Sequence, residues 1–169
     1  ILDLPGLIKG AAEGKGRGKE ILGVIRSCDM VLYIVDPFQD SHFRVLHREL
    51  ENAGIRLNQT KPPVFVKRVD KGGIDVRTTV EQTHLTPEEM GDIIRSFGYT
   101  SAIVTLRADT TAEMLVDTMV GTRVYSKSVI AVNKIDIASE EEIVSAEKAL
   151  PQDWPIMRIS AFKGTGLDE

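Results

Sequence analysis

Asn133, Lys134 and Asp136 form the motif N-K-x-D, directly after the apolar run SVIAV at residues 128–132. A carboxylate in this place can accept two parallel hydrogen bonds from the ring N–H and the exocyclic amine of guanine. Adenine would put an acceptor against the same carboxylate, so Asp136 would select guanine both by pairing and by repulsion. Lys134 can lay its stem along the base, and Asn133 can brace a neighbouring loop. The motif therefore predicts a guanine-reading site at the end of a strand.

A second motif, D-x-x-G, lies at Asp3 to Gly6, after residues that look like the tail of an apolar strand. An aspartate at a strand end can hold Mg²⁺, usually through water, and the backbone N–H of a glycine can donate to the terminal phosphate of a nucleotide. D-x-x-G alone is weak support. It recurs at Asp70 to Gly73, where we interpret it as the turn of a hairpin and nothing more.

A third motif begins with Ser160, Ala161 and Phe162 and follows the apolar run at residues 156–159. A tight turn of small residues brings backbone N–H groups close to O6 of a purine. The three motifs each follow a strand, in the order D-x-x-G, N-K-x-D and S-A. Ligands bind at the carboxyl ends of strands in open α/β sheets. Together the motifs predict a site for GTP or GDP with Mg²⁺.

The elements that must position these motifs are short apolar strands alternating with helices. Runs at residues 30–35, 128–132 and 156–159 are mainly apolar and do not alternate with polar residues, which is typical of buried parallel strands. Helical patterns cover residues 20–26, 41–53 and 139–150, the last opened by a Ser cap and three glutamates. We therefore expect an α/β fold with a doubly wound, mostly parallel sheet.

Residues 58–121 predict a separate insert within this fold. Short strands at 64–66 and 74–76 flank the turn sequence DKGG and predict a hairpin. A helix opened by Thr86 and Pro87, a strand at 102–106 and a helix at 111–120 follow, which gives a small β-β-α-β-α domain. Asp3 and Asn133 are 130 positions apart, and two crossovers of ~30 residues each leave room for such an insert. The main domain would then comprise residues 1–57 and 122–169.

Composition narrows the class of protein. The 169 residues carry a formal net charge of −4 and 42% hydrophobic residues, which suits a globular chain and gives no overall basic character for nucleic-acid or membrane binding. A single cysteine, Cys28, cannot build a disulfide framework, which favours a reducing, intracellular setting. No apolar run reaches the ~18 residues of a membrane span. We expect a cytoplasmic protein without membrane contact, and we interpret the ends as those of a segment cut from a longer chain.

The glycine-rich loop KGAAEGKGRGKE at residues 9–20 does not fit a phosphate-binding loop of the form G-x-x-x-x-G-K-[ST], because the spacing fails and no Ser or Thr follows its Gly-Lys pairs. It begins three residues after Gly6, where a switch that senses the γ-phosphate would lie. We expect its glycines to allow reordering on hydrolysis. Lys15, Arg17 and Lys19 would be free to meet a partner or ribosomal phosphate.

Several stretches together carry a family resemblance: DLPGLIKGAAEGKGRGKE, ELENAGIRLN, KPP, DKGGI, VTLRADTTAE, NKID and ISA. With them the chain resembles the DRG proteins, the developmentally regulated GTP-binding branch of the Obg-related GTPases. The resemblance implies a P-loop GTPase fold with a small α/β insert similar to a ribosomal-protein domain. It also implies a P-loop and a helical segment before Ile1, a TGS domain beyond Glu169, association with the ribosome, and a regulatory partner protein.

Roles follow from the resemblance by position. Asp3 would lie on the Mg²⁺ side and Gly6 would sense the γ-phosphate. The residues that read the base would be Asn133, Lys134 and Asp136, with Ser160 and Ala161 in the loop beside it. Leu7 stands where many signalling GTPases place a glutamine that orients water. The resemblance therefore suggests slow hydrolysis assisted by a monovalent cation, and little nucleotide binding by this segment alone, because it has no P-loop or switch I.

A second hypothesis is a binding module centred on the insert, docking to ribosomal RNA or protein through basic residues of the hairpin, namely Lys67, Arg68, Lys71 and Arg77. The alternative interpretation, which we favour because such charge runs are common, is an ordinary solvated strand face. A dinucleotide-dependent enzyme is disfavoured, because no G-x-G-x-x-G lies between a first strand and its helix.

Overall fold

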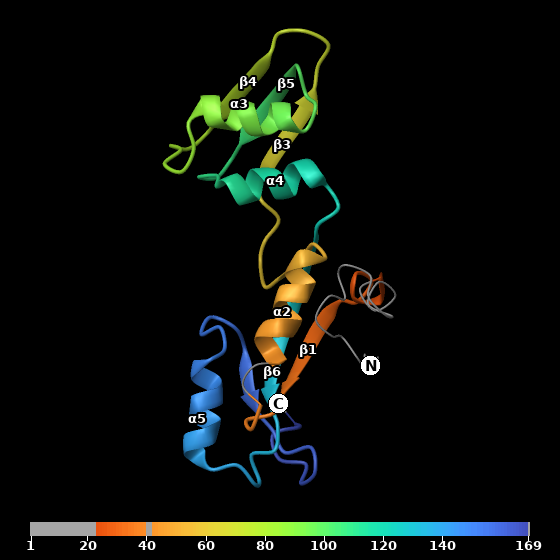
Figure 1. Cartoon of the computed structure of the whole chain (residues 1–169), viewed down its shortest axis with the longest axis vertical. Helices are drawn as coiled ribbons and strands as arrows, with labels where there is room; N and C mark the ends of the chain where they lie inside the picture. Colours follow the sequence, from red (N-terminus) through yellow and green to blue (C-terminus); the bar gives the residue numbers. More distant parts are fainter. Residues whose placement is uncertain (1–22, 40–41, 169) are drawn as a thin grey trace. The chain divides into compact units, whose positions relative to one another are not determined.

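A computed structural model describes residues 23–39 and 42–168 of the chain, which divide into two compact units (Figure 1). The first unit contains the chain up to Gln59 and again from Val124. The second unit is the intervening segment Thr60–Arg123. Each unit has its own sheet and its own hydrophobic core.

The first unit is built on a parallel sheet in which β6 (Val124–Val132) is the central strand. One edge of β6 pairs with β1 (Met30–Val35). Its other neighbours are β2 (Ile55–Leu57), which pairs with the start of β6, and β7 (Ile156–Arg158), which pairs with its end. All of these pairings are parallel, so the expected α/β class with a mostly parallel sheet is confirmed.

Asn58 fills the gap between β2 and β7 along β6. Its side-chain Nδ2 donates to the carbonyl oxygen of Ser128 at 2.9 Å, and the N–H of Ser128 donates to its Oδ1 at 2.8 Å. The amide therefore satisfies both backbone groups of a residue that is almost fully buried. Asn58 has a φ of 53°, a left-handed conformation that asparagine tolerates better than most residues. One side chain thus continues the ladder where no strand is present.

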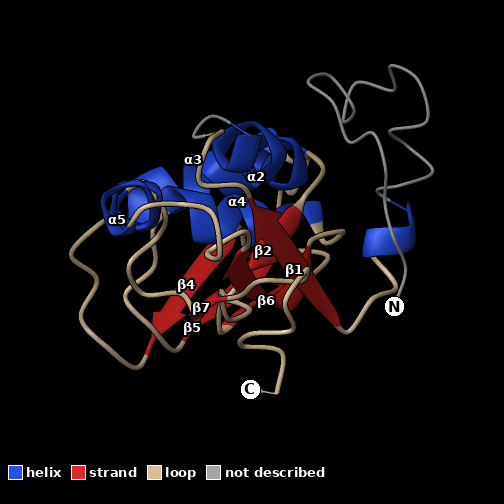
Figure 2. Cartoon of the chain, turned by 90° about the horizontal axis from the view of Figure 1, so that it is seen from below, coloured by secondary structure: helices blue, strands red, loops and turns tan. Residues whose placement is uncertain are grey.

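Two helices pack on one face of this sheet, α2 (His42–Asn52) and α5 (Glu140–Lys148) (Figure 2). Ser139 and Glu142 form the capping box that opens α5, as its sequence predicts. The core joins both helices to β1 and β6 through buried apolar side chains, among them Tyr33, Phe43, Leu50, Ile130, Val132 and Ile143. On the opposite face, Met30, Leu32 and Ile34 of β1 are exposed, so within the described residues helices cover one side of this sheet.

The second unit contains a three-stranded sheet in the order β3-β5-β4. Its strands are β3 (Val64–Arg68), β4 (Ile74–Thr78) and β5 (Ala102–Leu106). β3 pairs antiparallel with β5, and β4 pairs parallel with β5. The expected hairpin of β3 with β4 is therefore wrong, although both strands and the element order β-β-α-β-α are present.

The central place of β5 has a clear physical reason. Ala102, Val104 and Leu106 are fully buried, so β5 is the most apolar strand of the three and gains ladders on both edges. The turn between β3 and β4 opens wide enough to admit it, because both sides of that turn bond to residues at the start of β5. Val69 donates to the carbonyl of Ser101, and the N–H of Ala102 donates to the carbonyl of Gly73.

Helices α3 (Pro87–Ser96) and α4 (Ala112–Val120) pack on one face of this second sheet. Thr86 caps α3 in a capping box with Glu89, as its sequence predicts, and Thr111 caps α4. Their buried side chains Met90, Ile94 and Leu115 complete the core. In the described parts of both units, no helix is long and apolar enough to span a bilayer.

Candidate guanine-nucleotide site

Three parallel strands of the first unit, β1, β6 and β7, end at the same edge of the sheet, because each pairs in register with its neighbour. The polar segments that follow them are tied together by backbone hydrogen bonds. The N–H of Asn133 donates to the carbonyl of Val35 at 2.9 Å, and the N–H of Ile135 donates to that of Ile159 at 3.3 Å. The sheet therefore brings the segment 133–136 and the segment 160–164 side by side.

Asp136 and Ser160 are in direct contact at this edge. The hydroxyl of Ser160 donates to Oδ1 of Asp136 at 2.7 Å, and the N–H of Lys163 donates to the same hydroxyl at 3.1 Å. Ser160 is fully buried, whereas Asp136 is half-buried at the surface. No hydrogen bond in the described part of the chain engages Oδ2 of Asp136. The carboxylate is thus oriented through one oxygen and keeps the other available.

Asn133 ties the same two segments at a second point. Its Oδ1 accepts a hydrogen bond from the N–H of Ala161 at 3.0 Å. Ala161 and the next residue, Phe162, lie on the surface, and the Phe162 side chain is 90% exposed. Asn133 therefore braces the loop, and the aromatic ring beside it has no apolar cover within the described residues.

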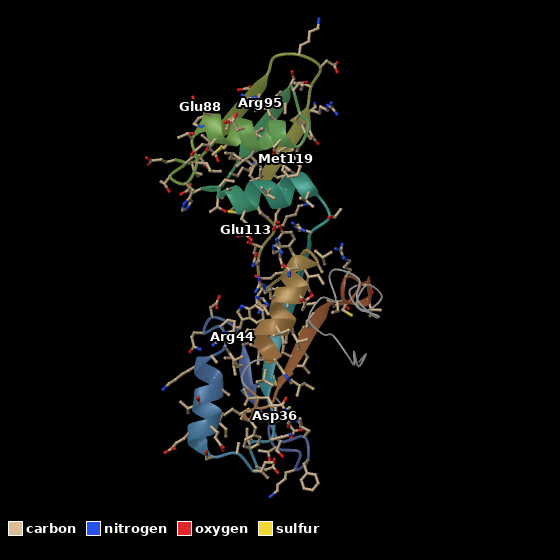
Figure 3. The ribbon with its side chains drawn as sticks, in the orientation of Figure 1. Asp36, Arg44, Glu88, Arg95, Glu113 and Met119 are labelled. Carbon is tan, nitrogen blue, oxygen red and sulfur yellow. The ribbon has the colours of Figure 1, made fainter. Side chains whose placement is uncertain are left out.

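Lys134 is held by a residue that the sequence analysis did not single out. Its Nζ lies 2.8 Å from Oδ2 of Asp36. Asp36, which Figure 3 labels, directly follows β1. The hydrogen bond from Lys134 lowers the pKa of the Asp36 carboxyl, and the backbone N–H of Phe38 adds to the effect. A signal for Asp36 was present in the sequence, because it closes the apolar run of β1 in the way that Asn133 closes that of β6.

The backbone of the 160–166 loop requires glycine at one position in particular. Gly166 has a φ of 71°, and a Cβ there would lie 2.3 Å from the carbonyl oxygen of Arg158. The loop is also closed by bonds within itself, since the N–H of Ser160 donates to the carbonyl of Thr165 at 2.9 Å. A rigid turn therefore presents Ala161 and Phe162 at the surface.

Part of the predicted site lies outside the described residues. Asp3, Gly6 and Leu7 fall there, as does the glycine-rich loop at 9–20. Among the residues that the structure does describe, no group of three or more His, Cys, Asp or Glu side chains could hold a metal ion. The structure thus brings together the predicted residues at 133–136 and 160–162 and adds Asp36 to them.

Comparison with known proteins matches nearly the whole chain to two models of GTPase domains. A family model described as a 50S ribosome-binding GTPase matches residues 1–68. A second family model, described as the C-terminal region of that GTPase domain, which is called MMR_HSR1, matches residues 71–169.

Several curated relatives are about two-fifths identical. An uncharacterized GTP-binding protein of Methanocaldococcus jannaschii is 41% identical over 99% of this chain and 43% of its own length. Developmentally-regulated G-protein 3 of Arabidopsis thaliana is 40% identical over 92% of this chain and 42% of its own length. Ribosome-interacting GTPase 1 of Saccharomyces cerevisiae is 37% identical over 91% of this chain and 44% of its own length.

The chain spans less than half the length of these relatives. Within that span the match is nearly continuous, and it includes the N-K-x-D and S-A segments that the sheet brings together. The chain belongs to the family of developmentally regulated GTP-binding proteins.

Proposed function

We propose that this chain carries the base-reading part of a GTP-binding protein that acts as a nucleotide-dependent switch linked to ribosomes. The observation that carries the proposal is the contact between Ser160 and Asp136, which orients a half-buried carboxylate beside the backbone of Ala161. The residues fit a guanine base, since an oriented carboxylate with a free oxygen is the acceptor that two parallel N–H donors require.

Each residue has a distinct part in this proposal. Asp136 accepts from the ring N–H and the exocyclic amine of guanine, and Ser160 holds the carboxylate in the plane that this needs. Lys134 lies along the base with its ammonium group held by Asp36, so its position is set before the nucleotide arrives. Asn133 fixes the loop that carries Ala161 and Phe162 next to the base.

The remaining parts of the switch rest on sequence. Asp3 would hold Mg²⁺ and Gly6 would sense the γ-phosphate, with the loop at 9–20 as the segment that responds. Leu7 cannot orient water, so hydrolysis by the whole protein would be slow and assisted by a monovalent cation. The name of the yeast relative supports a ribosomal partner. We further propose a regulatory partner protein and a cytoplasmic site of action.

The test is nucleotide binding by the full-length protein that contains this chain. Fluorescent GDP should be displaced by unlabelled GDP and not by ADP. Asp136→Ala should weaken GDP binding by at least tenfold, because the two hydrogen bonds to a charged acceptor are lost. Asp153→Ala removes an exposed carboxylate of the same unit and should leave binding unchanged. Equal binding of ADP and GDP, or an intact affinity in Asp136→Ala, would refute the proposal.

A further inference from the structure

The face of the β3-β5-β4 sheet opposite α3 and α4, which no described element of the second unit covers, carries an arrangement of side chains that the nucleotide site does not use. Side chains alternate strictly in this sheet, so those at 64, 66, 102, 104 and 106 enter the core under α3 and α4. The opposite face presents Phe65 and Lys67 from β3, Ile103 and Thr105 from β5, and Asp75 and Arg77 from β4. We call these six residues, with the adjoining Arg107, the open face.

Strand register arranges the open face in two rows. Phe65 lies opposite Thr105, which lies opposite Arg77, and Lys67 lies opposite Ile103, which lies opposite Asp75. Ile103 and Thr105 are half-buried in the middle, whereas the Phe65 side chain is 55% exposed at the edge. The Arg107 guanidinium lies over the Phe65 ring, 5.2 Å from its centroid. An aromatic ring and a planar cation therefore lie together on the open face.

Charge is distributed unevenly over the second unit. Asp75 is the sole acidic residue of its three strands, and it is already paired with Arg77 at 2.8 Å. No ion pair of the described residues involves Lys67 or Arg107. The helices carry acidic side chains instead, including Glu88 on α3 and Glu113 on α4, which Figure 3 labels. The open face is thus the basic side of a unit whose helical side is acidic.

The structure also separates the basic residues that looked like one cluster in the sequence. Arg68 lies on the helix-covered side, with its guanidinium 5.5 Å from the centroid of the Tyr99 ring. Lys67 and Arg77 lie on the open face, on strands that are separated by β5. Arg107, which is distant in sequence, joins them through its contact with Phe65.

We propose that the open face binds single-stranded RNA, with one unstacked base on Phe65 and neighbouring phosphates at Lys67, Arg77 and Arg107. Exposed aromatic rings and arginine planes on a sheet are the surfaces on which proteins stack splayed bases. Lys67 lies two residues from Phe65, ~7 Å along the strand, which is within reach of the adjoining phosphate. A protein partner fits less well, because the open face has two apolar side chains among four charges, whereas interface cores are depleted in charge.

The choice of RNA over DNA rests on the proposed link to ribosomes. The binding itself does not depend on nucleotide, so it can be measured on the 169-residue chain without GTP. If this chain binds no RNA while the full-length protein recognises GDP through Asp136, the result would contradict the open-face proposal and leave the proposed function intact.

The experiment is a fluorescence anisotropy titration of a labelled 12-nucleotide RNA with this chain at moderate salt. Phe65→Ala should weaken binding about tenfold, since stacking is lost, while Phe65→Trp should retain it. Phe65→Leu should bind as weakly as Phe65→Ala, because a leucine keeps the apolar contact and lacks the ring. Lys67→Glu and Arg107→Glu should weaken binding and lower the dependence of affinity on salt.

Two matched controls make the result specific. Phe97→Ala removes a 37% exposed ring at the end of α3, and Arg68→Glu reverses a charge next to Lys67 on the other side of the sheet. The RNA affinity of both control variants should stay within twofold of that of the wild type. Circular dichroism should confirm that every variant is folded. The proposal would be overturned by equal losses in the controls, by an unaffected Phe65→Ala, by tighter binding of duplex RNA or single-stranded DNA, or by no saturable binding.

Discussion

Ser160 is the residue that orients the carboxylate of Asp136 in the candidate site. It is fully buried, and its hydroxyl receives the N–H of Lys163 while donating to Asp136. The hydroxyl therefore has a fixed direction, and the carboxylate that it contacts has one as well. Lys134 is positioned in the same way by Asp36. A site whose groups are already oriented loses less conformational entropy when it binds.

Arg158 is the last residue of β7 and lies two residues before Ser160. Its Nε and Nη2 donate to the two carboxylate oxygens of Glu147 at 2.7 and 2.8 Å, which joins β7 to α5. These hydrogen bonds lower the pKa of Glu147. A lowered folded-state pKa stabilises the fold above the pKa of the unfolded state, and this stabilisation is lost as the pH falls through the folded-state value.

We therefore predict that Arg158→Gln makes the melting temperature less dependent on pH between neutral pH and about pH 3, because the charge-assisted part of the stabilisation is absent at every pH. Thermal denaturation over this range measures the effect. Arg44→Gln removes the same charge from an exposed position on α2 and should keep the wild-type slope (Figure 3). Parallel curves for wild type and Arg158→Gln would contradict the assignment.

At the scale of elements, Asn58 holds together a sheet edge that no strand completes. Asn58→Ala would leave the N–H and the carbonyl of buried Ser128 without their partners. Because each unsatisfied buried group costs about 1–3 kcal/mol, we expect the free energy of unfolding to fall by about 2–6 kcal/mol for the two groups.

Urea denaturation would measure this loss of stability. Two further variants separate the effect of the hydrogen bonds from that of backbone strain. Asn58→Gly suits the positive φ and still lacks the amide, so it should be nearly as destabilised as Asn58→Ala. Gln59→Ala changes the adjoining exposed residue and should have a stability close to that of the wild type. Recovery of stability in Asn58→Gly would assign the effect to backbone strain instead of the hydrogen bonds.

The elements that the sequence predicted well are those whose signals are local. β1 is a continuous apolar run, and α3 and α5 begin with capping boxes, so neighbours in sequence are enough to specify them. β2 was not predicted, because three residues are too few to show a period and it forms by pairing with distant β6. The hairpin was wrong for the same reason, since the partner of both strands lies beyond α3.

The candidate site likewise contains residues that a local sequence motif predicts and residues that only long-range contacts bring in. The segments 133–136 and 160–162 could be found by motif, because the chemistry of guanine recognition requires particular residue types at fixed spacing. Asp36 closes the apolar run of β1 but matches no motif, and its pairing with Lys134 comes from a neighbouring strand. Arg107 gave no signal, because its role comes from a cross-sheet contact with Phe65. The nucleotide-binding roles of all the candidate-site residues, and those of Asp3 and Gly6, remain predictions.

At the scale of the whole molecule, the two units have separate cores and should unfold as separate cooperative parts. Trp154 is the sole tryptophan and packs against the core of the first unit, so its fluorescence reports on that unit. Leu115→Ala should destabilise the second unit by about 2–5 kcal/mol and leave the tryptophan transition in place.

Leu50→Ala is the matched change in the core of the first unit, and it should shift the tryptophan transition by a comparable amount. Amide exchange of the residues in β5 would follow the second unit independently. A shift of the tryptophan transition in Leu115→Ala as large as that in Leu50→Ala would show that the two cores unfold together.

In both sheets the strand that all the others pair with comes late in the chain. β1 and β2 are made long before β6, and β3 and β4 are made before β5. While the chain is being synthesised, the early strands therefore have no partner among the described strands made up to that point. The described pairings of each sheet form only after its central strand has left the ribosome, and the second unit, which is made in between, can close first. The order of synthesis thus lets the insert fold before the domain that surrounds it.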